Sequence, residues 1–179
     1  MSEAEAALSP KVLLDEAGVA DVIEQMAAQI APLIDDDWIC MCLLTGGLWF
    51  AADLTRALSR KGCNPLFDAL WIASYGDARR SRGEVDVLAG LQRDLKGRSV
   101  LLLDDVFDSG LSLRASIKII EQAGAKVVKS AVFARKPWPE PRGVQPDFVG
   151  WEAPARFLVG YGMDDRGRYR GLPGVAAVD

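Results

Sequence analysis

The segment SVLLLDDVFDSGLSLRASIKIIEQAG, residues 99–124, carries the clearest structural pattern in the sequence. An apolar run ends abruptly in two carboxylates, Asp104 and Asp105, and a third, Asp108, follows within a turn. A short apolar run bounded by a turn predicts a buried strand, and the segment after the turn predicts a helix. We therefore expect a strand, a turn and a helix, with the acids gathered where the strand ends.

The rest of the chain repeats this alternation. We expect further strands at 38–47, 65–76 and 126–135 and helices at 11–34 and 48–62. The polar segment 77–97 is expected to be a mobile loop with a short strand or turn. Alternation of this kind is typical of an α/β fold with a doubly wound, mainly parallel sheet.

No internal repeat or linker divides the sequence, so we expect a single domain over residues 1–179. Its core is expected to span about 12–135. The segment 136–179 carries many prolines and glycines and is expected to form a compact appendage from short pieces. This appendage would be a small hood that also includes N-terminal residues.

The composition excludes several classes of site and partner. The formal charge of −4 argues against a dedicated nucleic-acid or membrane-surface protein, because such proteins usually need a basic field. The absence of histidine rules out Ser-His-Asp and Cys-His nucleophile systems. The three cysteines form no plausible disulfide framework, so buried reduced thiols are expected. With no secretory signal pattern and no apolar run near the ~20 residues of a membrane span, we expect a cytoplasmic protein.

Three turns are expected to converge, at 44–48, 74–80 and 104–112, because ligands of doubly wound sheets bind beyond the carboxyl ends of the strands. An aspartate pair there is by itself more often a cap or a solvated turn. Residues 108–112, however, place consecutive N–H groups and two hydroxyls at a helix N-terminus, which suits a phosphate dianion. Acids beside a phosphate would repel it unless they served sugar hydroxyls or Mg²⁺. The turn therefore indicates a phosphorylated sugar bound with a metal.

Competing motifs are absent from the sequence, which contains no G-x-x-x-x-G-K-[ST], G-x-G-x-x-G or G-x-S-x-G. What remains, LLLDDVFDSGLSL at 101–113, resembles the phosphoribosyl-pyrophosphate (PRPP) motif of type I phosphoribosyltransferases. The resemblance extends to the hypoxanthine-guanine phosphoribosyltransferase family over most of residues 12–175, through LLTGGLWFAADL (43–54), SYGDARRSRGEVDVL (74–88) and PDFVGWEAPARFLVGYGMDDRGRYRGLP (146–173). Within the last segment, VGYGMDD and YRGLP point to the 6-oxopurine branch.

The resemblance implies the type I phosphoribosyltransferase fold and a glycosyltransferase of purine salvage. Such an enzyme transfers the phosphoribosyl group from PRPP to hypoxanthine or guanine and releases pyrophosphate and IMP or GMP, with Mg²⁺ as cofactor. The family also suggests a homodimer or homotetramer.

The resemblance further implies roles for individual residues. Asp108 would be the general acid/base near purine N7. Lys136, or Arg135 if the register shifts by one, would donate to the 6-oxo group. Phe157 would stack on the purine, and Leu158 would read the base edge through its backbone. PRPP would be bound at its ribose and the associated Mg²⁺ by Asp104 and Asp105. Its 5′-phosphate would be bound by Ser109, Gly110, Leu111 and Ser112, and its pyrophosphate by Thr45, Gly46 and Arg170. Ser74 and Tyr75 would also contact PRPP, at the head of a closing loop. Asp164, beside the purine, would bind a second Mg²⁺.

Plain structural roles remain open for several of these residues. Phe157 could be a core aromatic residue, Lys136 a solvated strand end, Asp164 a turn residue and Arg170 a surface ion-pair partner. Two positions also depart from the family pattern, with Thr45 where lysine is common and Asp104 where glutamate is usual. We nevertheless predict that the Leu44–Thr45 peptide is cis, as in the family.

Two alternative functions also remain open. One is a xanthine-preferring phosphoribosyltransferase, because the 6-oxo contact is shared. The other is a regulatory, nucleotide-sensing and RNA-binding homologue of the pyrimidine-attenuator type. The retained Asp108 and the net acidic charge argue against this second alternative, so nucleic acid is not an expected partner.

Overall fold

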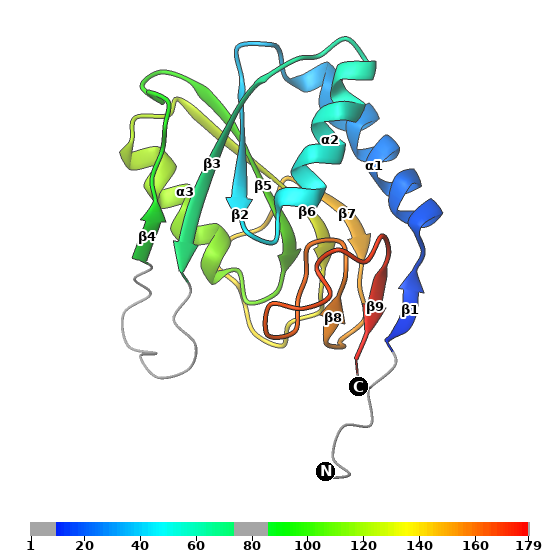
Figure 1. Cartoon of the computed structure of the whole chain (residues 1–179). Coiled ribbons are helices and arrows are strands. Elements are labelled where there is room, and N and C mark those ends of the chain that lie inside the picture. Colours follow the sequence, from blue (N-terminus) through cyan, green and yellow to red (C-terminus); the bar gives the residue numbers. More distant parts are fainter. Residues whose placement is uncertain (1–9, 74–85, 179) are drawn as a thin grey trace.

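Six strands form the main sheet, in the spatial order β4, β3, β2, β5, β6 and β7 (Figure 1). The computed structural model describes residues 10–73 and 86–178. The strands are β2 (Ile39–Leu44), β3 (Leu66–Ala73), β4 (Asp86–Ala89), β5 (Ser99–Phe107), β6 (Val127–Arg135) and β7 (Phe148–Glu152). Neighbouring strands run parallel except for β3 and β4. The predicted α/β fold with a mainly parallel sheet is confirmed.

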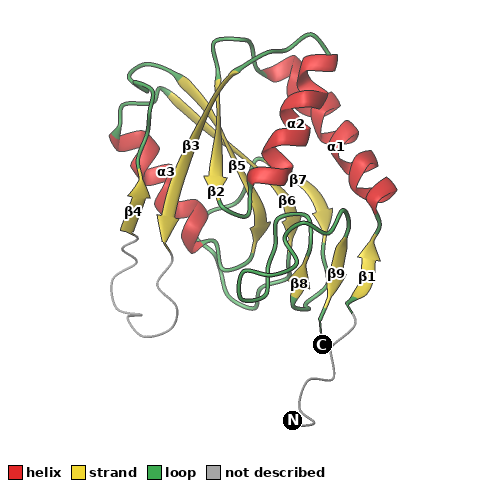
Figure 2. Cartoon of the chain, in the orientation of Figure 1, coloured by secondary structure: helices red, strands yellow, loops and turns green. Residues whose placement is uncertain are grey.

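Helices cover both faces of this sheet. Helices α1 (Glu16–Ile30) and α2 (Leu48–Arg60) lie on one face and α3 (Leu111–Gln122) lies on the other (Figure 2). In β2, Cys40 and Cys42 belong to the core under α1 and α2, whereas Met41 and Leu43 belong to the core under α3. The strand is buried on both faces, which explains why its sequence is a continuous apolar run.

A smaller antiparallel sheet lies near the carboxyl ends of the main strands (Figures 1 and 2). It contains β1 (Lys11–Leu14), β9 (Val175–Ala177) and β8 (Leu158–Val159), in that order. Both ends of the described chain therefore meet in one sheet, with Val12 opposite Ala176.

The prediction of a helix from residue 11 was wrong at its start. Residues 11–14 pair with β9, and the helix begins only after Asp15, whose side chain accepts a hydrogen bond from the Gly18 N–H at 2.8 Å. An aspartate that caps the first turn is a common helix start. The helix ends at Ile30, and a 3₁₀ turn at Ala31–Leu33 contains the proline.

The expected appendage at 136–179 also differs in part. Strand β7 adds to the edge of the main sheet, parallel to β6, with Ala131 opposite Phe148 and Arg135 opposite Glu152. The smaller sheet takes its strands only from residues after β7 and from β1. Flanking prolines and glycines obscured a strand that is only partly buried.

The cysteines are free and buried, as predicted. Burial raises the pKa of the Cys40 and Cys42 thiols to about 12, with a further contribution from Cys63 and from Asp104, respectively. In the described parts of the chain, we find no helix that combines the length and the apolar character needed to span a membrane.

Candidate active site

The turn after β2 packs against the end of β5 through two glycines. A Cβ atom added to Gly46 would lie 2.0 Å from Oδ2 of Asp105, and one added to Gly47 would lie 2.9 Å from the Leu103 carbonyl oxygen. Only residues without side chains allow this approach. The Leu44–Thr45 peptide in this turn is cis, as predicted.

The two aspartates at this point are largely withdrawn from solvent. Asp104 is 8% exposed, and its Oδ1 accepts a hydrogen bond from the Asp105 N–H at 3.0 Å. Burial raises the pKa of both carboxyl groups, and the neighbouring charge of Asp105 raises that of Asp104 further. The charge of Arg170 acts in the opposite direction on Asp105. A buried carboxylate pair of this kind is stabilised by a bound cation or by hydrogen-bond donors.

A first cavity of about 230 Å³ lies beyond these strand ends. The predicted residues in its lining are Gly46, Asp104, Asp105, Asp108, Ser109, Gly110, Ser112 and Arg170. Gly110 directly precedes α3 as its N-cap residue and has φ +80°, a conformation that favours glycine. The cavity therefore combines the carboxylate pair with the N-terminus of a helix.

Four of the residues predicted to bind PRPP are not among those that line this cavity. Thr45 is exposed at the turn, and Leu111 is 54% exposed, and neither lines the cavity. Ser74 and Tyr75 lie outside the described residues, as do residues 77–85 of the loop that they would head.

A second cavity, of about 210 Å³, shares a wall with the first. It is lined by Asp105, Val106, Asp108, Lys136, Phe157, Leu158, Met163 and Asp164, of which the first three also line the first cavity. Phe157 is 51% exposed, so its ring is not a core residue.

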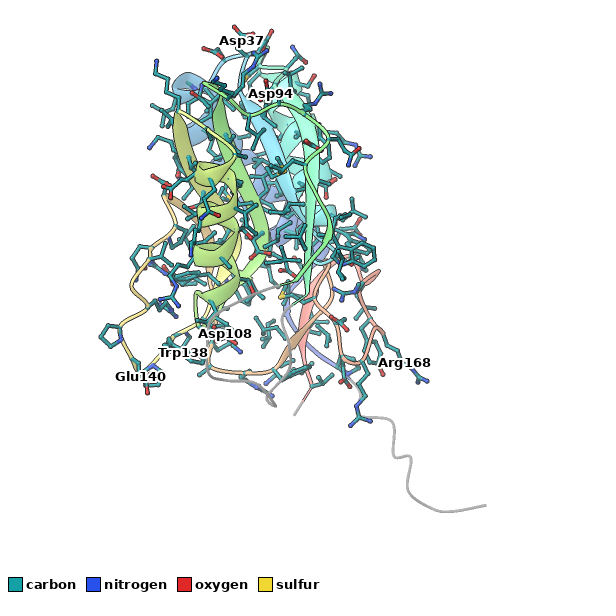
Figure 3. The ribbon with its side chains drawn as sticks, turned by 90° about the vertical axis from the view of Figure 1, so that its left-hand side faces the viewer. Asp37, Asp94, Asp108, Trp138, Glu140 and Arg168 are labelled. Carbon is teal, nitrogen blue, oxygen red and sulfur yellow. The ribbon has the colours of Figure 1, made fainter. Side chains whose placement is uncertain are left out.

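Lys136 and Asp108 face each other in this second cavity. The Lys136 Nζ lies 3.2 Å from Oδ2 of Asp108. The preceding Arg135 instead forms an ion pair with Glu152 on β7 and is absent from the cavity lining. The structure therefore turns Lys136, and not Arg135, toward the site. Figure 3 shows Asp108 at the end of the molecule where the carboxyl ends of the strands lie, and Asp37 and Asp94 at the opposite end.

Arg170 lines the first cavity and connects it to the loop at residues 160–163 and to Asp164. Its Nη2 lies 2.6 Å from Oδ1 of Asp164, and its Nη1 donates to the Gly162 carbonyl oxygen at 2.5 Å. Gly162 in turn approaches Gly46, because a Cβ atom added to Gly162 would lie 2.0 Å from the Gly46 oxygen. Arg170 is therefore held beside the glycine turn and not on the open surface.

Comparison with known proteins shows the family to which the chain belongs. The family model described as phosphoribosyl transferase domain matches residues 11–166. The hypoxanthine-guanine phosphoribosyltransferase of Bacillus subtilis (strain 168) is 32% identical over 164 residues, which cover 91% of this chain and 89% of that relative. The chain belongs to this family.

Other family members show similar agreement. The hypoxanthine-guanine phosphoribosyltransferase of Aquifex aeolicus (strain VF5) is 33% identical over 171 residues, which cover 94% of each chain. The crystal structure of a hypoxanthine-guanine phosphoribosyltransferase from Bacillus anthracis, with a HEPES molecule in its active site, aligns with a TM-score of 0.85 at 28% identity. This alignment covers 96% of the present chain and 100% of that one. The type I phosphoribosyltransferase fold is thus confirmed.

The donors in the site suit a hard divalent cation that completes its coordination with water and substrate. Mg²⁺ is usually bound by one or two carboxylates together with substrate phosphates and water. Asp104 and Asp105 provide such a pair, whereas Asp164 is engaged by Arg170 and by the Gly167 N–H. Within residues 10–73 and 86–178, no cluster of three or more metal-ligating side chains occurs. The carboxylate pair therefore fits a metal that is shared with a phosphorylated ligand.

Sequence reasoning missed several residues at the site, mostly apolar residues of the cavity walls. Val106 lines both cavities and Met163 lines the second. Val106 follows the acidic pair within β5, and this position could have indicated its place. Arg142 contacts Asp108 and Lys136 from a proline-rich segment, where no motif or periodicity marks it.

Proposed function

We propose that this chain transfers the 5-phosphoribosyl group of PRPP to hypoxanthine or guanine, giving IMP or GMP and pyrophosphate, with Mg²⁺ as cofactor. The observation that carries the proposal is the wall that the two cavities share, formed by Asp105, Val106 and Asp108. A reaction that joins a phosphorylated sugar to a flat base needs two adjacent sites with the reacting atoms at their boundary.

The second cavity suits the purine. The exposed ring of Phe157 offers a stacking surface, and the Lys136 ammonium group can donate to the 6-oxo oxygen. Leu158 forms part of the wall and can read the base edge through its backbone groups. In this pose Asp108 lies beside N7.

The first cavity suits the phosphoribosyl group. Residues 109–112 lie at the N-terminus of α3, and their N–H groups and hydroxyls can bind the 5′-phosphate. Asp104 and Asp105 can accept hydrogen bonds from the ribose hydroxyls. Arg170 and the Gly46 turn lie where the pyrophosphate would leave.

The metal would be held by Asp104 and Asp105, with Asp164 as a second site if Arg170 moves. When bound, it would neutralise the charge that develops on the leaving pyrophosphate. The protein adds the Arg170 guanidinium and the backbone N–H groups of the turns on the same side.

The proposed step needs no covalent nucleophile, which agrees with a chain that has no histidine. Purine N9 forms a bond to the anomeric carbon while the bond from that carbon to the pyrophosphate oxygen breaks. The N9 lone pair forms the new bond, and the proton on N7 passes to the Asp108 carboxylate while the electrons of the N–H bond stay in the purine ring. Lys136, at 3.2 Å from Asp108, can stabilise both the carboxylate and the 6-oxo oxygen.

The test is formation of nucleotide from PRPP and Mg²⁺ with hypoxanthine, guanine, xanthine and adenine in parallel. We expect turnover with hypoxanthine or guanine. Turnover with xanthine alone would contradict the proposed base preference, and turnover with no base would contradict the proposed activity. We also propose that the protein is cytoplasmic and forms a homodimer or homotetramer. Light scattering after size-exclusion chromatography would measure the oligomeric state.

A further inference from the structure

We propose that Arg142 is a positioning residue that fixes Asp108 and Lys136 relative to each other through their backbones. Its geometry is independent of the reaction, whereas its effect on catalysis rests on the proposed function. The two residues come from different strand ends, so their side chains meet only if both backbones are held in place.

The segment that carries Arg142 has little means of ordering itself. Residues 136–147 connect β6 to β7 without a helix or strand. Its prolines, which have no N–H to donate, are Pro137, Pro139, Pro141 and Pro146. Loops of this length without secondary structure are uncommon in compact domains and are often functional. Figure 3 shows Trp138 and Glu140 on this segment, at the same end of the molecule as Asp108.

The guanidinium group of Arg142 makes three contacts with the site. Its Nε donates to the Asp108 carbonyl oxygen at 2.6 Å, and its Nη2 donates to the Lys136 carbonyl oxygen. Its Cζ lies 4.6 Å from the centroid of the Phe107 ring. One planar group therefore joins the two backbones and rests on an aromatic face, a geometry that a lysine ammonium group cannot reproduce.

The support beneath Arg142 is rigid. Phe107 is the last residue of β5, is 1% exposed and belongs to the core under α3. Its carbonyl oxygen accepts a hydrogen bond from the Lys136 N–H at 3.0 Å. Arg142 thus packs on a buried core ring and hydrogen-bonds to the backbones of both Asp108 and Lys136.

The expected result of this arrangement is precise placement of the pair that faces the purine. The Asp108 carboxylate and the Lys136 ammonium group are 3.2 Å apart, although 28 positions separate them in sequence. A displacement of about 1 Å at a reacting group can cost on the order of 10²-fold in rate. Arg142 contacts residues that line the cavities but lines neither cavity itself, so its contribution would come through position and not through contact with substrate.

The first experiment measures position without activity. Backbone amide hydrogen exchange is compared between the full-length protein and its Arg142→Lys and Arg142→Ala variants. We expect exchange to accelerate in both variants at residues 108–112 and 136–144, and to stay unchanged in β2 and β5. Unchanged exchange in the two loops would overturn the proposal, whatever reaction the protein catalyses.

The second experiment measures the catalytic consequence, with Arg135→Ala as matched control. Arg135 precedes Lys136 but pairs with Glu152 on β7. We expect Arg142→Lys to lower kcat by about 10- to 100-fold and to raise KM for the purine, with KM for PRPP changed less than about threefold and the control close to wild type. An equal loss in the control, or a fall in active fraction with both KM values unchanged, would overturn the positioning role. If the wild-type protein itself shows no turnover, the proposed function fails and the exchange result still decides the geometry.

Discussion

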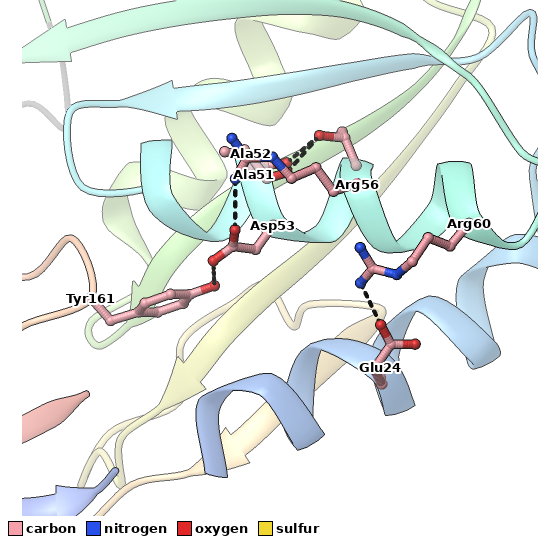
Figure 4. A network of polar contacts seen from close by, with 8 residues as sticks. Glu24, Ala51, Ala52, Asp53, Arg56, Arg60 and Tyr161 are labelled. Atoms are coloured by element: carbon pink, nitrogen blue, oxygen red, sulfur yellow. Dashed lines mark hydrogen bonds and ion pairs between the residues drawn. The ribbon is translucent and has the colours of Figure 1, made fainter. Parts of the chain in front are cut away.

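The Tyr161 hydroxyl donates a hydrogen bond to Oδ2 of Asp53 at 2.9 Å and so joins the loop at residues 160–163 to helix α2 (Figure 4). Tyr161 is 3% exposed, and its ring packs 4.6 Å from that of Phe133. Burial, followed by the negative charge of Asp53, raises the pKa of the Tyr161 hydroxyl well above its usual range, so it remains a donor at neutral pH. The next residue, Gly162, accepts from Arg170 and approaches the Gly46 turn. The hydrogen bond therefore supports the site from outside.

Replacing Tyr161 with phenylalanine should lower the free energy of unfolding by about 1–2 kcal/mol, because the variant loses a hydrogen bond to a charged acceptor. Urea denaturation monitored by circular dichroism measures this change. The control is Arg56→Ala, which removes the other partner of Asp53, an arginine whose side chain is 70% exposed. An exposed ion pair contributes little, so the control should change stability by less than about 0.5 kcal/mol. Equal effects of the two substitutions would show that the buried hydroxyl has no special role.

Replacing Gly46 with alanine should impair PRPP binding while the fold persists. The new methyl group would collide with the Asp105 carboxylate at 2.0 Å, so the turn and the acid cannot both keep their positions. We expect the PRPP dissociation constant to rise by about tenfold or more, as for the loss of one hydrogen bond to a charged group, measured by isothermal titration calorimetry with Mg²⁺. Gly90→Ala is the control, because a Cβ atom at that position meets nothing closer than 3.9 Å. Unchanged PRPP affinity in Gly46→Ala would contradict the assignment of this turn.

Replacing Arg170 with alanine should raise KM for PRPP by about tenfold or more, with a smaller effect on KM for the purine. The reason is that Arg170 lines the first cavity only and supplies positive charge beside Asp105. Steady-state kinetics with each substrate varied separate the two effects. The exposed Arg168 in the same loop provides the control, as Arg168→Ala. A selective increase in KM for the purine would contradict the assignment of Arg170 to the PRPP site.

The buried thiols predict a particular pH dependence. The pKa of Cys40 and Cys42 is about 12 in the folded protein and about 8.5 in an unfolded chain. The unfolded state therefore releases these protons first, and the stabilisation present below about pH 8.5 is lost as the pH rises, by up to about 1.4 kcal/mol per pH unit for each thiol. At pH 8 the folded protein should react very slowly with Ellman's reagent, and all three cysteines should react once urea is added. Prompt reaction of a thiol in the native protein would contradict this burial.

The main sheet could be predicted from sequence because its strands are buried on both faces. The run at 39–44 is apolar at every position and is followed by a turn with two glycines. The apolar part of β5 is likewise followed by aspartates. Such local signals need no knowledge of partners. They also placed Asp104, Asp105 and Asp108 at one edge, because the carboxyl ends of parallel strands meet there.

Features that depend on distant partners could not be predicted in this way. The sequence of strand β1 alone predicts a helix, because its partner, β9, lies at the other end of the sequence. Strand β7 could not be predicted from its sequence, because its apolar residues are only partly buried at the sheet edge. The contacts of Arg142 with Asp108 and Lys136 arise from the path of a proline-rich loop, which no periodic pattern describes.

The most direct test of the account compares Asp108→Asn with the wild-type protein in nucleotide formation from PRPP, Mg²⁺ and hypoxanthine or guanine. Asparagine keeps the size of the side chain but cannot accept the purine proton as a carboxylate does. We predict that the wild type forms IMP or GMP, and that the variant loses about 10²–10⁴-fold in kcat while PRPP still binds. Equal turnover by the variant and the wild type would contradict the role of Asp108 at the shared wall of the two cavities.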